Sequence, residues 1–213
     1  MLDITLRPLK DNVFAPLSRS VPASITPVHI TAAAFVAGLV SCLFACAGHR
    51  TPSLIFWAAN RALDCLDGAV ARHRDQQTVL GGFLDLLGDF IVYALVPIAC
   101  VVGNGWSGQQ TPGLAVALLE ASFWINNFVL LYIAALVEKG KDELTSLAMR
   151  PALIEGFESA VFFTLMLGMP CLVGVLSAVM FVGVVFGTGQ RVRWVVLALS
   201  RTEETAGMKR KKR

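Results

Sequence analysis

The chain has 213 residues, of which 55% are hydrophobic and only 15% are charged, and its mean hydropathy is +0.66. Soluble domains carry about 25% charged residues, so a water-soluble globule of this size could not hide so much apolar surface. Disordered, collagen-like and nucleic-acid-binding classes are excluded because each needs more charge, glycine or proline. The composition predicts an integral membrane protein with no nucleic-acid partner.

The net charge is +3 at pH 7, and its placement is uneven. The last five residues, 209–213, are all lysine or arginine, whereas the rest of the chain carries more acidic than basic side chains. A terminal basic cluster beside a membrane domain is expected to contact anionic lipid headgroups on the cytoplasmic side. The five cysteines follow neither a zinc-binding nor a disulfide pattern, so we expect thiols packed as small hydrophobic side chains.

The N-terminal segment, residues 1–27, carries several charged side chains and does not resemble a signal peptide. Leu9, Val13 and Leu17 recur every four residues, with Phe14 beside them. This spacing predicts a short amphipathic helix that lies in the membrane interface. An irregular tail is the alternative.

Six mostly apolar segments follow, judged against the roughly 20 residues that a membrane span needs. They lie at about 28–47, 52–72, 81–101, 112–137 and 152–169, and from about 172 towards 199. The second and fifth are diluted by polar residues. Lysine and arginine gather after the second and fourth segments and at the C-terminus, whereas Arg50 is the one basic residue predicted on the opposite side.

By the positive-inside rule, this charge distribution predicts a multi-pass protein with both termini in the cytoplasm. The predicted architecture is all-α, with six transmembrane helices and an N-terminal interfacial amphipathic helix. One six-helix domain covers residues 28–200, and a basic cytoplasmic tail covers residues 201–213.

Four aspartates lie inside the second and third segments, where an ionisable side chain costs several kcal/mol and therefore needs a reason. Asp64 and Asp67 are three residues apart, and Asp85 and Asp89 are four apart, so each pair shares one helix face. The two segments are expected to be antiparallel neighbours joined by a short loop. Their acidic faces should therefore meet near the cytoplasmic end.

Four carboxylates that converge in a poorly solvated site need protons or divalent cations. Their hard oxygen atoms suit Mg²⁺ or Mn²⁺, and a phosphate-bearing substrate would complete the coordination. Gly68, Ala71 and Gly81 leave the adjacent helix faces nearly bare, so a nucleobase could approach the backbone. The pattern favours a nucleotide diphosphate handled by two-metal chemistry, with a proton or cation pathway as the alternative.

The second and third segments also carry a complete motif, Asp64-x2-Asp67-Gly68-x2-Ala71-Arg72-x8-Gly81-x3-Asp85-x3-Asp89. It resembles the signature of the CDP-alcohol phosphatidyltransferase family at every fixed position. The resemblance implies transfer of a phosphatidyl group from CDP-diacylglycerol to the hydroxyl of a small alcohol, with release of CMP, by a homodimer. The alternatives are a CDP-amino-alcohol phosphotransferase of the same family, or a membrane cation carrier or scaffold that uses the same acidic cluster.

The same resemblance assigns roles to the motif residues. It implies that Asp64, Asp67, Asp85 and Asp89 hold two Mg²⁺ or Mn²⁺ ions, and that Asp89 is also the catalytic general base. Contacts to the nucleotide are implied for the remaining motif residues, Gly68, Ala71, Arg72 and Gly81.

One element departs from the family pattern. Members often carry a Pro-Asn-x-x-Thr element at the start of the first span, whereas residues 27–31 here keep Pro27 and Thr31 but lack the asparagine. Thr31 is therefore the remaining candidate for a nucleotide contact there. His29 is expected to be an interfacial histidine rather than a catalyst.

The acceptor pocket is predicted in the second half of the chain. Arg150 and Arg191 could bind a phosphorylated acceptor. Glu155 and Glu158 could instead bind the hydroxyls of a polyol or the ammonium of an amino alcohol, or be structural. The sequence leaves the acceptor open.

Overall fold

The computed structural model describes residues 13–103, 111–138 and 156–211, and these residues form helices and turns with no strand among them. The helices are α2 (Pro27–Cys46), α3 (Arg50–His73), α4 (Val79–Gly103), α5 (Thr111–Glu138), α7 (Gly156–Gly168), the short 3-10 helix η1 (Pro170–Leu172) and α8 (Val173–Lys211).

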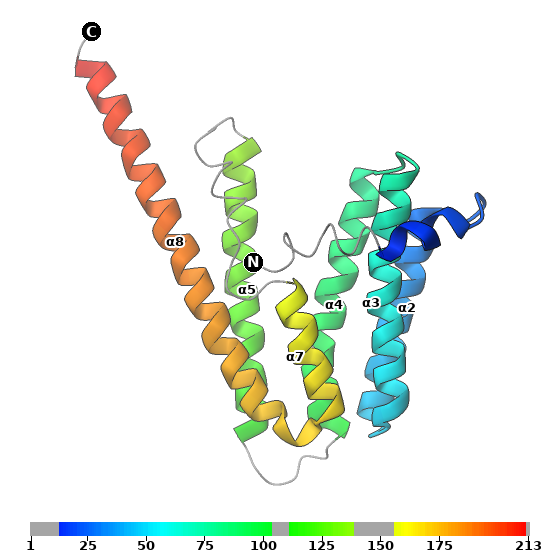
Figure 1. The fold of residues 1–213 in the computed structure, drawn as a ribbon. Helices are drawn as coiled ribbons and strands as arrows, with labels where there is room; N and C mark the ends of the chain where they lie inside the picture. The colour runs from blue at the N-terminus through cyan, green and yellow to red at the C-terminus, as the bar shows by residue number, and fades with distance from the viewer. Residues whose placement is uncertain (1–12, 104–110, 139–155, 212–213) are drawn as a thin grey trace.

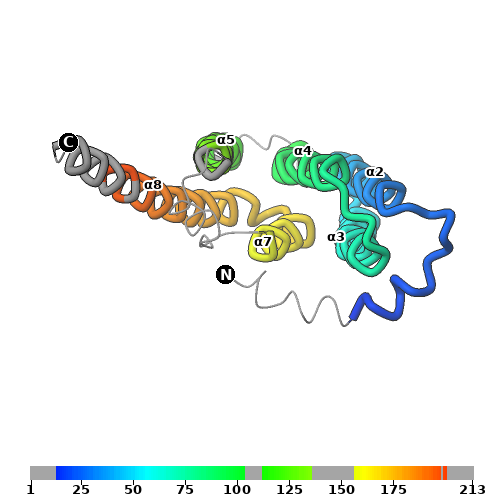
Figure 2. The backbone as a smooth tube through the Cα atoms, turned by 90° about the horizontal axis from the view of Figure 1, so that it is seen from above, coloured from blue at the N-terminus to red at the C-terminus, as the bar shows by residue number. Residues whose placement is uncertain are grey.

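Successive helices run up and down, so that α2 begins and α8 ends on the same side of the bundle (Figure 1). Seen from above, α2, α3 and α4 form one group, α5 and α8 form a second, and α7 lies between them (Figure 2). A core of large side chains joins the two groups through α7, and Trp57, Phe163, Met166, Leu119 and Met180 are almost fully buried in it.

Four of the described helices are long and apolar enough to cross a membrane: α2, α4, α5 and α8. The prediction of an all-helical, multi-pass membrane protein is confirmed. The count of six spans is not, because α3 carries Asn60, Arg61, Asp64 and Asp67, and α7 has only 13 described residues.

The N-terminal segment is described from Val13 onward. Residues 13–20 are helical, and Val13 and Leu17 are exposed, whereas Leu9 lies outside the described residues. After this helix, the chain is tied to the end of α3 by Arg74, which donates to the backbone oxygens of Val21 at 2.5 Å and Ile25 at 2.9 Å. The entry to α2 is thereby fixed beside the turn between α3 and α4.

Close packing of α2 holds α3 and α4 in register. A side chain at Gly38 would bring its Cβ within 2.6 Å of Val92 Cγ2 and 3.1 Å of Asn60 Nδ2. Asn60, 3% exposed, donates to the backbone oxygen of Ala34 at 2.8 Å. Small residues and an interhelical hydrogen bond are the usual means of bringing membrane helices together. This contact aims the acidic face of α3 towards α4.

The second group depends on polar contacts between α5 and α8. Asn126 Oδ1 accepts hydrogen bonds from Arg191 Nη1 at 2.8 Å and Thr188 Oγ1 at 3.2 Å. Helix α8 continues past residue 200 to Lys211, so the predicted tail begins inside a helix rather than after one. All five cysteines are described as free thiols. Cys42 and Cys100 are buried as expected of small hydrophobic side chains, whereas Cys46 and Cys171 are exposed.

Candidate functional site

A cavity of about 210 Å³ lies where α3 ends and α4 begins, beside the start of α2. All five residues that the sequence assigns to the nucleotide line it, together with two of the four aspartates. These lining residues are Thr31, Asp67, Gly68, Ala71, Arg72, Gly81 and Asp85. The structure therefore brings most of the motif around one hollow.

The turn between α3 and α4 shapes one wall of this cavity. Asp75 adopts a left-handed backbone conformation, with φ of 52°, directly after the end of α3. Thr78 Oγ1 then accepts a hydrogen bond from the Gly81 backbone N–H at 3.0 Å, at the start of α4. The first turn of α4 borders the cavity, and a helix N-terminus of this kind favours an anionic group such as a phosphate.

Glycine leaves room on the wall formed by α3. A Cβ at Gly68 would lie 3.1 Å from Arg72 Nη1, so a larger residue there would displace that guanidinium as well as fill the cavity. Arg72, one turn further along α3, borders the same space. The cavity thus combines a bare surface, a cation and carboxylates, which is the chemistry that a nucleotide diphosphate needs.

The start of α2 contributes Thr31. Its Oγ1 donates to Asp67 Oδ2 at 2.6 Å, and Asp67 is 5% exposed. His29 has a different role, because its Nδ1 accepts a hydrogen bond from the Thr26 backbone N–H at 3.3 Å and so caps α2.

The aspartates of the two helices meet as the spacing predicts. The carboxyl groups of Asp64 on α3 and Asp85 on α4 lie within hydrogen-bonding reach of each other, with Asp67 and Asp89 close by. Two carboxyl groups approach in this way only with a proton or a cation to offset their repulsion.

The donor set fits a divalent cation by its chemistry, since carboxylate oxygens are the ligands that Mg²⁺ and Mn²⁺ prefer. Within the described part of the chain, no three His, Cys, Asp or Glu side chains are already arranged around a common metal position.

Arg61 is a site residue that the sequence analysis did not single out. It lies one turn before Asp64, and its Nη2 donates to Asp89 Oδ1 at 2.5 Å. The sequence does contain a signal for this residue: an arginine inside a membrane segment is costly, so one that lies beside four acids needs a functional reason.

Of the predicted acceptor residues, the two that the structure describes do not line the cavity. Arg150 and Glu155 lie outside the described residues. Glu158 is half-buried on α7, and Arg191, 8% exposed, is bound to Asn126 of α5. Neither described residue lines the cavity beside the motif.

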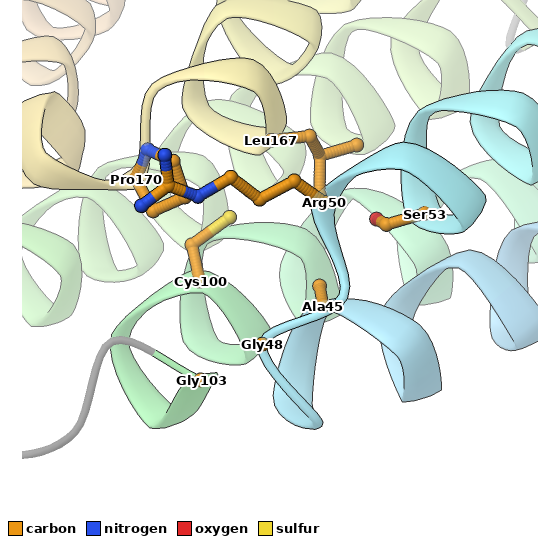
Figure 3. A pocket seen from close by; sticks show the side chains of 8 residues that line it. All are labelled: Ala45, Gly48, Arg50, Ser53, Cys100, Gly103, Leu167 and Pro170. Carbon is orange, nitrogen blue, oxygen red and sulfur yellow. The ribbon is translucent and has the colours of Figure 1, made fainter.

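A second, smaller cavity of about 50 Å³ lies at the opposite end of α3, where Arg50 extends towards Cys100 and Pro170 (Figure 3). It has room for little more than one or two water molecules, whose share of liquid volume is about 30 Å³ each. Its lining contains no carboxylate, so it lacks the chemistry of the motif.

The helical membrane fold and the motif around the cavity both point to one protein family. The family model described as CDP-alcohol phosphatidyltransferase matches residues 24–199. The chain belongs to this family.

Two curated relatives match parts of the chain. The Escherichia coli inner membrane protein YnjF is 37% identical over 116 residues, covering 48% of this chain and 56% of that protein. An archaetidylinositol phosphate synthase from Methanothermobacter thermautotrophicus is 43% identical over 82 residues, covering 37% of this chain and 41% of that protein. The matches therefore span about half the length of these relatives or less.

The fold is similar to that of phosphatidylinositol phosphate synthase from Mycobacterium tuberculosis. A crystal structure of that protein with CDP-DAG bound superposes with a TM-score of 0.70 at 19% identity, covering 85% of this chain and 92% of that one. A second crystal structure of the same protein, in complex with manganese and citrate, also gives 0.70, at 84% and 87% coverage.

Proposed function

We propose that the protein transfers a phosphatidyl group from CDP-diacylglycerol to the hydroxyl of a small alcohol and releases CMP. The observation that carries this proposal is the single cavity that gathers Thr31, Gly68, Ala71, Arg72 and Gly81 beside Asp67 and Asp85. Family membership and the CDP-DAG complex of the mycobacterial protein support it.

Different residues around the cavity contact the cytosine ring and the diphosphate of the donor. Gly68, Ala71 and Gly81 leave a flat surface for the cytosine ring, and Arg72 binds the diphosphate. The acceptor oxygen attacks the phosphorus on the lipid side. A new bond forms to the acceptor, the bond between the two phosphates breaks, and CMP leaves with the bridging oxygen.

Asp89 takes the proton of the acceptor hydroxyl. Its Oδ2 is the less constrained oxygen, at 3.5 Å from Arg61 Nη1, whereas Oδ1 lies 2.5 Å from Nη2. Asp64, Asp67 and Asp85, with Asp89 contributing, would hold a pair of divalent cations, and Thr31 orients Asp67 by its hydrogen bond. When bound, these cations neutralise charge on the transferring phosphoryl group and on the leaving CMP.

The site is proposed to face the cytoplasm, with all six helices crossing the membrane and both termini inside. The support is that α2 begins and α8 ends at the cavity end of the bundle (Figure 1), where Arg72 and Arg74 at the end of α3 also lie. A homodimer is proposed from family resemblance, and the exposed Trp124, Phe128 and Leu131 of α5 are available to a partner or to lipid.

For the acceptor, an inositol phosphate is the first to test. The support is that two similar proteins are named as synthases of archaetidylinositol phosphate and phosphatidylinositol phosphate. The competing class of acceptor is a phosphate-free polyol or an amino alcohol, whose hydroxyls or ammonium group could bind the carboxylate of Glu158.

The experiment is a CMP-release assay on purified protein in detergent, with CDP-diacylglycerol and Mg²⁺ or Mn²⁺. The acceptor panel contains inositol phosphate, inositol, glycerol 3-phosphate and serine, and a CDP-amino alcohol replaces the lipid donor in a parallel arm. We expect CMP release with one acceptor of the panel, and we expect the Asp89→Asn variant to lose this CMP release. Metal binding without CMP release from any pair would favour a cation carrier or scaffold.

A further inference from the structure

The cavity between α3 and α4 has two ends with different chemistry. Asp67 and Asp85 line it from within the two helices. Gln76 and Gln77 border it from the turn that joins these helices. Along α3, Ala71 lies four residues beyond Asp67, a rise of about 6 Å towards that turn. A nucleotide whose diphosphate lies at the carboxylates would therefore extend its base towards the two glutamines.

Arg72 belongs to the diphosphate side of this division. A Cβ at Gly68 would lie 3.1 Å from Arg72 Nη1 and 3.7 Å from its Cζ, so the guanidinium reaches back along α3 by about one turn. At that level a guanidinium suits phosphate oxygens. The end of the cavity beside the turn is left to the base.

The backbone of the turn holds Gln76 against the wall on which a base would lie. Asp75 takes the left-handed conformation, with φ of 52°, and the Gln76 N–H donates to the Ala71 backbone oxygen at 2.9 Å. This bond is the one that closes a Schellman motif at the end of a helix. It gives Gln76 a fixed place beside Ala71, while the side chains of Gln76 and Gln77 are exposed to a ligand.

Four neutral polar side chains line the cavity, and two of them are hydrogen-bonded within the protein. Thr31 donates to Asp67, and Thr78 accepts from the backbone N–H of Gly81. The other two are the glutamines of the turn. A carboxamide offers an acceptor oxygen and two donor hydrogens, and cytosine presents an amino group beside a ring nitrogen that accepts. The two edges are complementary.

We propose that Gln76 and Gln77 recognise the base of the donor nucleotide. Their carboxamides bind the edge of cytosine opposite the ribose, where Oε1 accepts from the 4-amino group and Nε2 donates to the adjacent ring nitrogen. Both are specificity-determining residues, and neither takes part in the displacement at phosphorus. The inference rests on the proposed function for the identity of the donor, and it adds the residues that select its base.

The test is equilibrium binding of ligands to the full-length, detergent-purified protein in Mg²⁺, measured by isothermal titration. The first ligand is CDP, and the second is the same diphosphate with 2-pyrimidinone as its base, which lacks only the 4-amino group of cytosine. Inorganic pyrophosphate, which has no base, is the third. We expect the unaltered protein to bind CDP about tenfold more tightly than the 2-pyrimidinone analogue, the effect of about one hydrogen bond.

The double variant Gln76→Leu with Gln77→Leu removes both carboxamides and keeps side chains of similar size. We expect it to bind CDP about tenfold more weakly and to lose the preference over the analogue, because the same hydrogen bond cannot be lost twice. Its dissociation constant for pyrophosphate should change less than about twofold. Gln190→Leu makes the same change on α8, away from the cavity, and should leave the binding of all three ligands unchanged.

A folded double variant that still prefers CDP over the analogue would overturn the proposal. So would equal weakening of all three ligands, because the glutamines would then support the turn rather than contact the base. Thermal melting and size-exclusion profiles report folding, and if the double variant does not fold, the two single variants decide by the same comparison.

The unaltered protein separates this inference from the function on which it rests. Failure to bind CDP at all would remove the transferase proposal itself, and the base-recognition role with it. Tight binding of CDP that does not depend on the 4-amino group would overturn the role of the glutamines alone and leave the transferase proposal standing.

Discussion

The two groups of helices differ in what their polar residues do. In α2–α4, polar side chains from three helices converge on one cavity, and Thr31, Asp67 and Asp85 all border it. In α5 and α8, Asn126, Thr188 and Arg191 contact one another and hold the helix pair together. Buried polar residues in a membrane protein therefore serve either chemistry or assembly, and the presence of an open cavity beside them separates the two cases.

The largest expected effect comes from breaking the acidic side of the first group. Asp85→Asn removes a charge from the carboxyl pair with Asp64, so metal binding should be lost and CMP release should fall by about 1,000-fold or more. Isothermal titration with Mn²⁺ and the CMP assay measure both. Asp75→Asn is the matched control, because it is exposed and its left-handed backbone suits asparagine. Near-normal turnover in Asp85→Asn would contradict the metal role of this carboxylate.

A second change tests the bare wall of the cavity without touching its acids. Gly68→Val places a branched side chain where a Cβ alone would lie 3.1 Å from Arg72 Nη1. We expect the dissociation constant of CDP to rise about 30-fold, equivalent to about 2 kcal/mol, while Mn²⁺ affinity changes less than about twofold. The comparison variant is Gly189→Val on α8, where a Cβ meets nothing within 4 Å. Equal nucleotide affinity in the two variants would remove Gly68 from the nucleotide site.

The next change asks whether the second group is only structural. Arg191→Gln should lower kcat/KM for a phosphate-bearing acceptor about tenfold if the arginine lies near that phosphate during turnover, because a charged hydrogen bond is lost. The measurement compares inositol phosphate with inositol. Arg193→Gln, exposed on the same helix, serves as the control. A loss of the same size with both acceptors would restrict Arg191 to its contact with Asn126.

The smallest expected effect concerns the N-terminal approach to the cavity. Arg74→Gln removes charged hydrogen bonds to the backbone of residues 21–25 that precede Pro27 and Thr31. We expect CDP to bind about threefold more weakly with an unchanged kcat, since the effect is about 0.7 kcal/mol of lost preorganisation. Steady-state kinetics at saturating donor separates the two constants. A lower kcat instead would mean that this segment takes part in the chemical step.

The motif was predictable because it is local. Intervals of three and four residues assign Asp64 and Asp67 to one helix face and Asp85 and Asp89 to another, and a short connection forces two such helices to be antiparallel neighbours. The cavity follows from these constraints together with the glycines. The family resemblance rested on the same residues, and the match over residues 24–199 confirmed it.

Contacts between distant residues were not predictable in the same way. The contacts of Arg61 with Asp89 and Tyr93 depend on how α3 and α4 pack against each other. Asn126 and Arg191 lie 65 positions apart, and nothing in the sequence between them signals their pairing. The end of the last helix was also missed, since polar residues beyond position 200 mark the edge of the apolar segment but do not end a helix.

The weak apolarity of α3 has a consequence for how the protein is made. In the six-span topology proposed above, Arg61, Asp64 and Asp67 each oppose insertion by about 2.5–3.5 kcal/mol when a helix stands alone near the bilayer centre. This helix is therefore expected to enter the membrane together with α2 before it and α4 after it, with the Gly38 contact closing the group. A mutation that weakens that contact is expected to lower the amount of protein in the membrane, because chains that fail to insert are degraded during synthesis. It is not expected to slow the enzyme molecules that do insert.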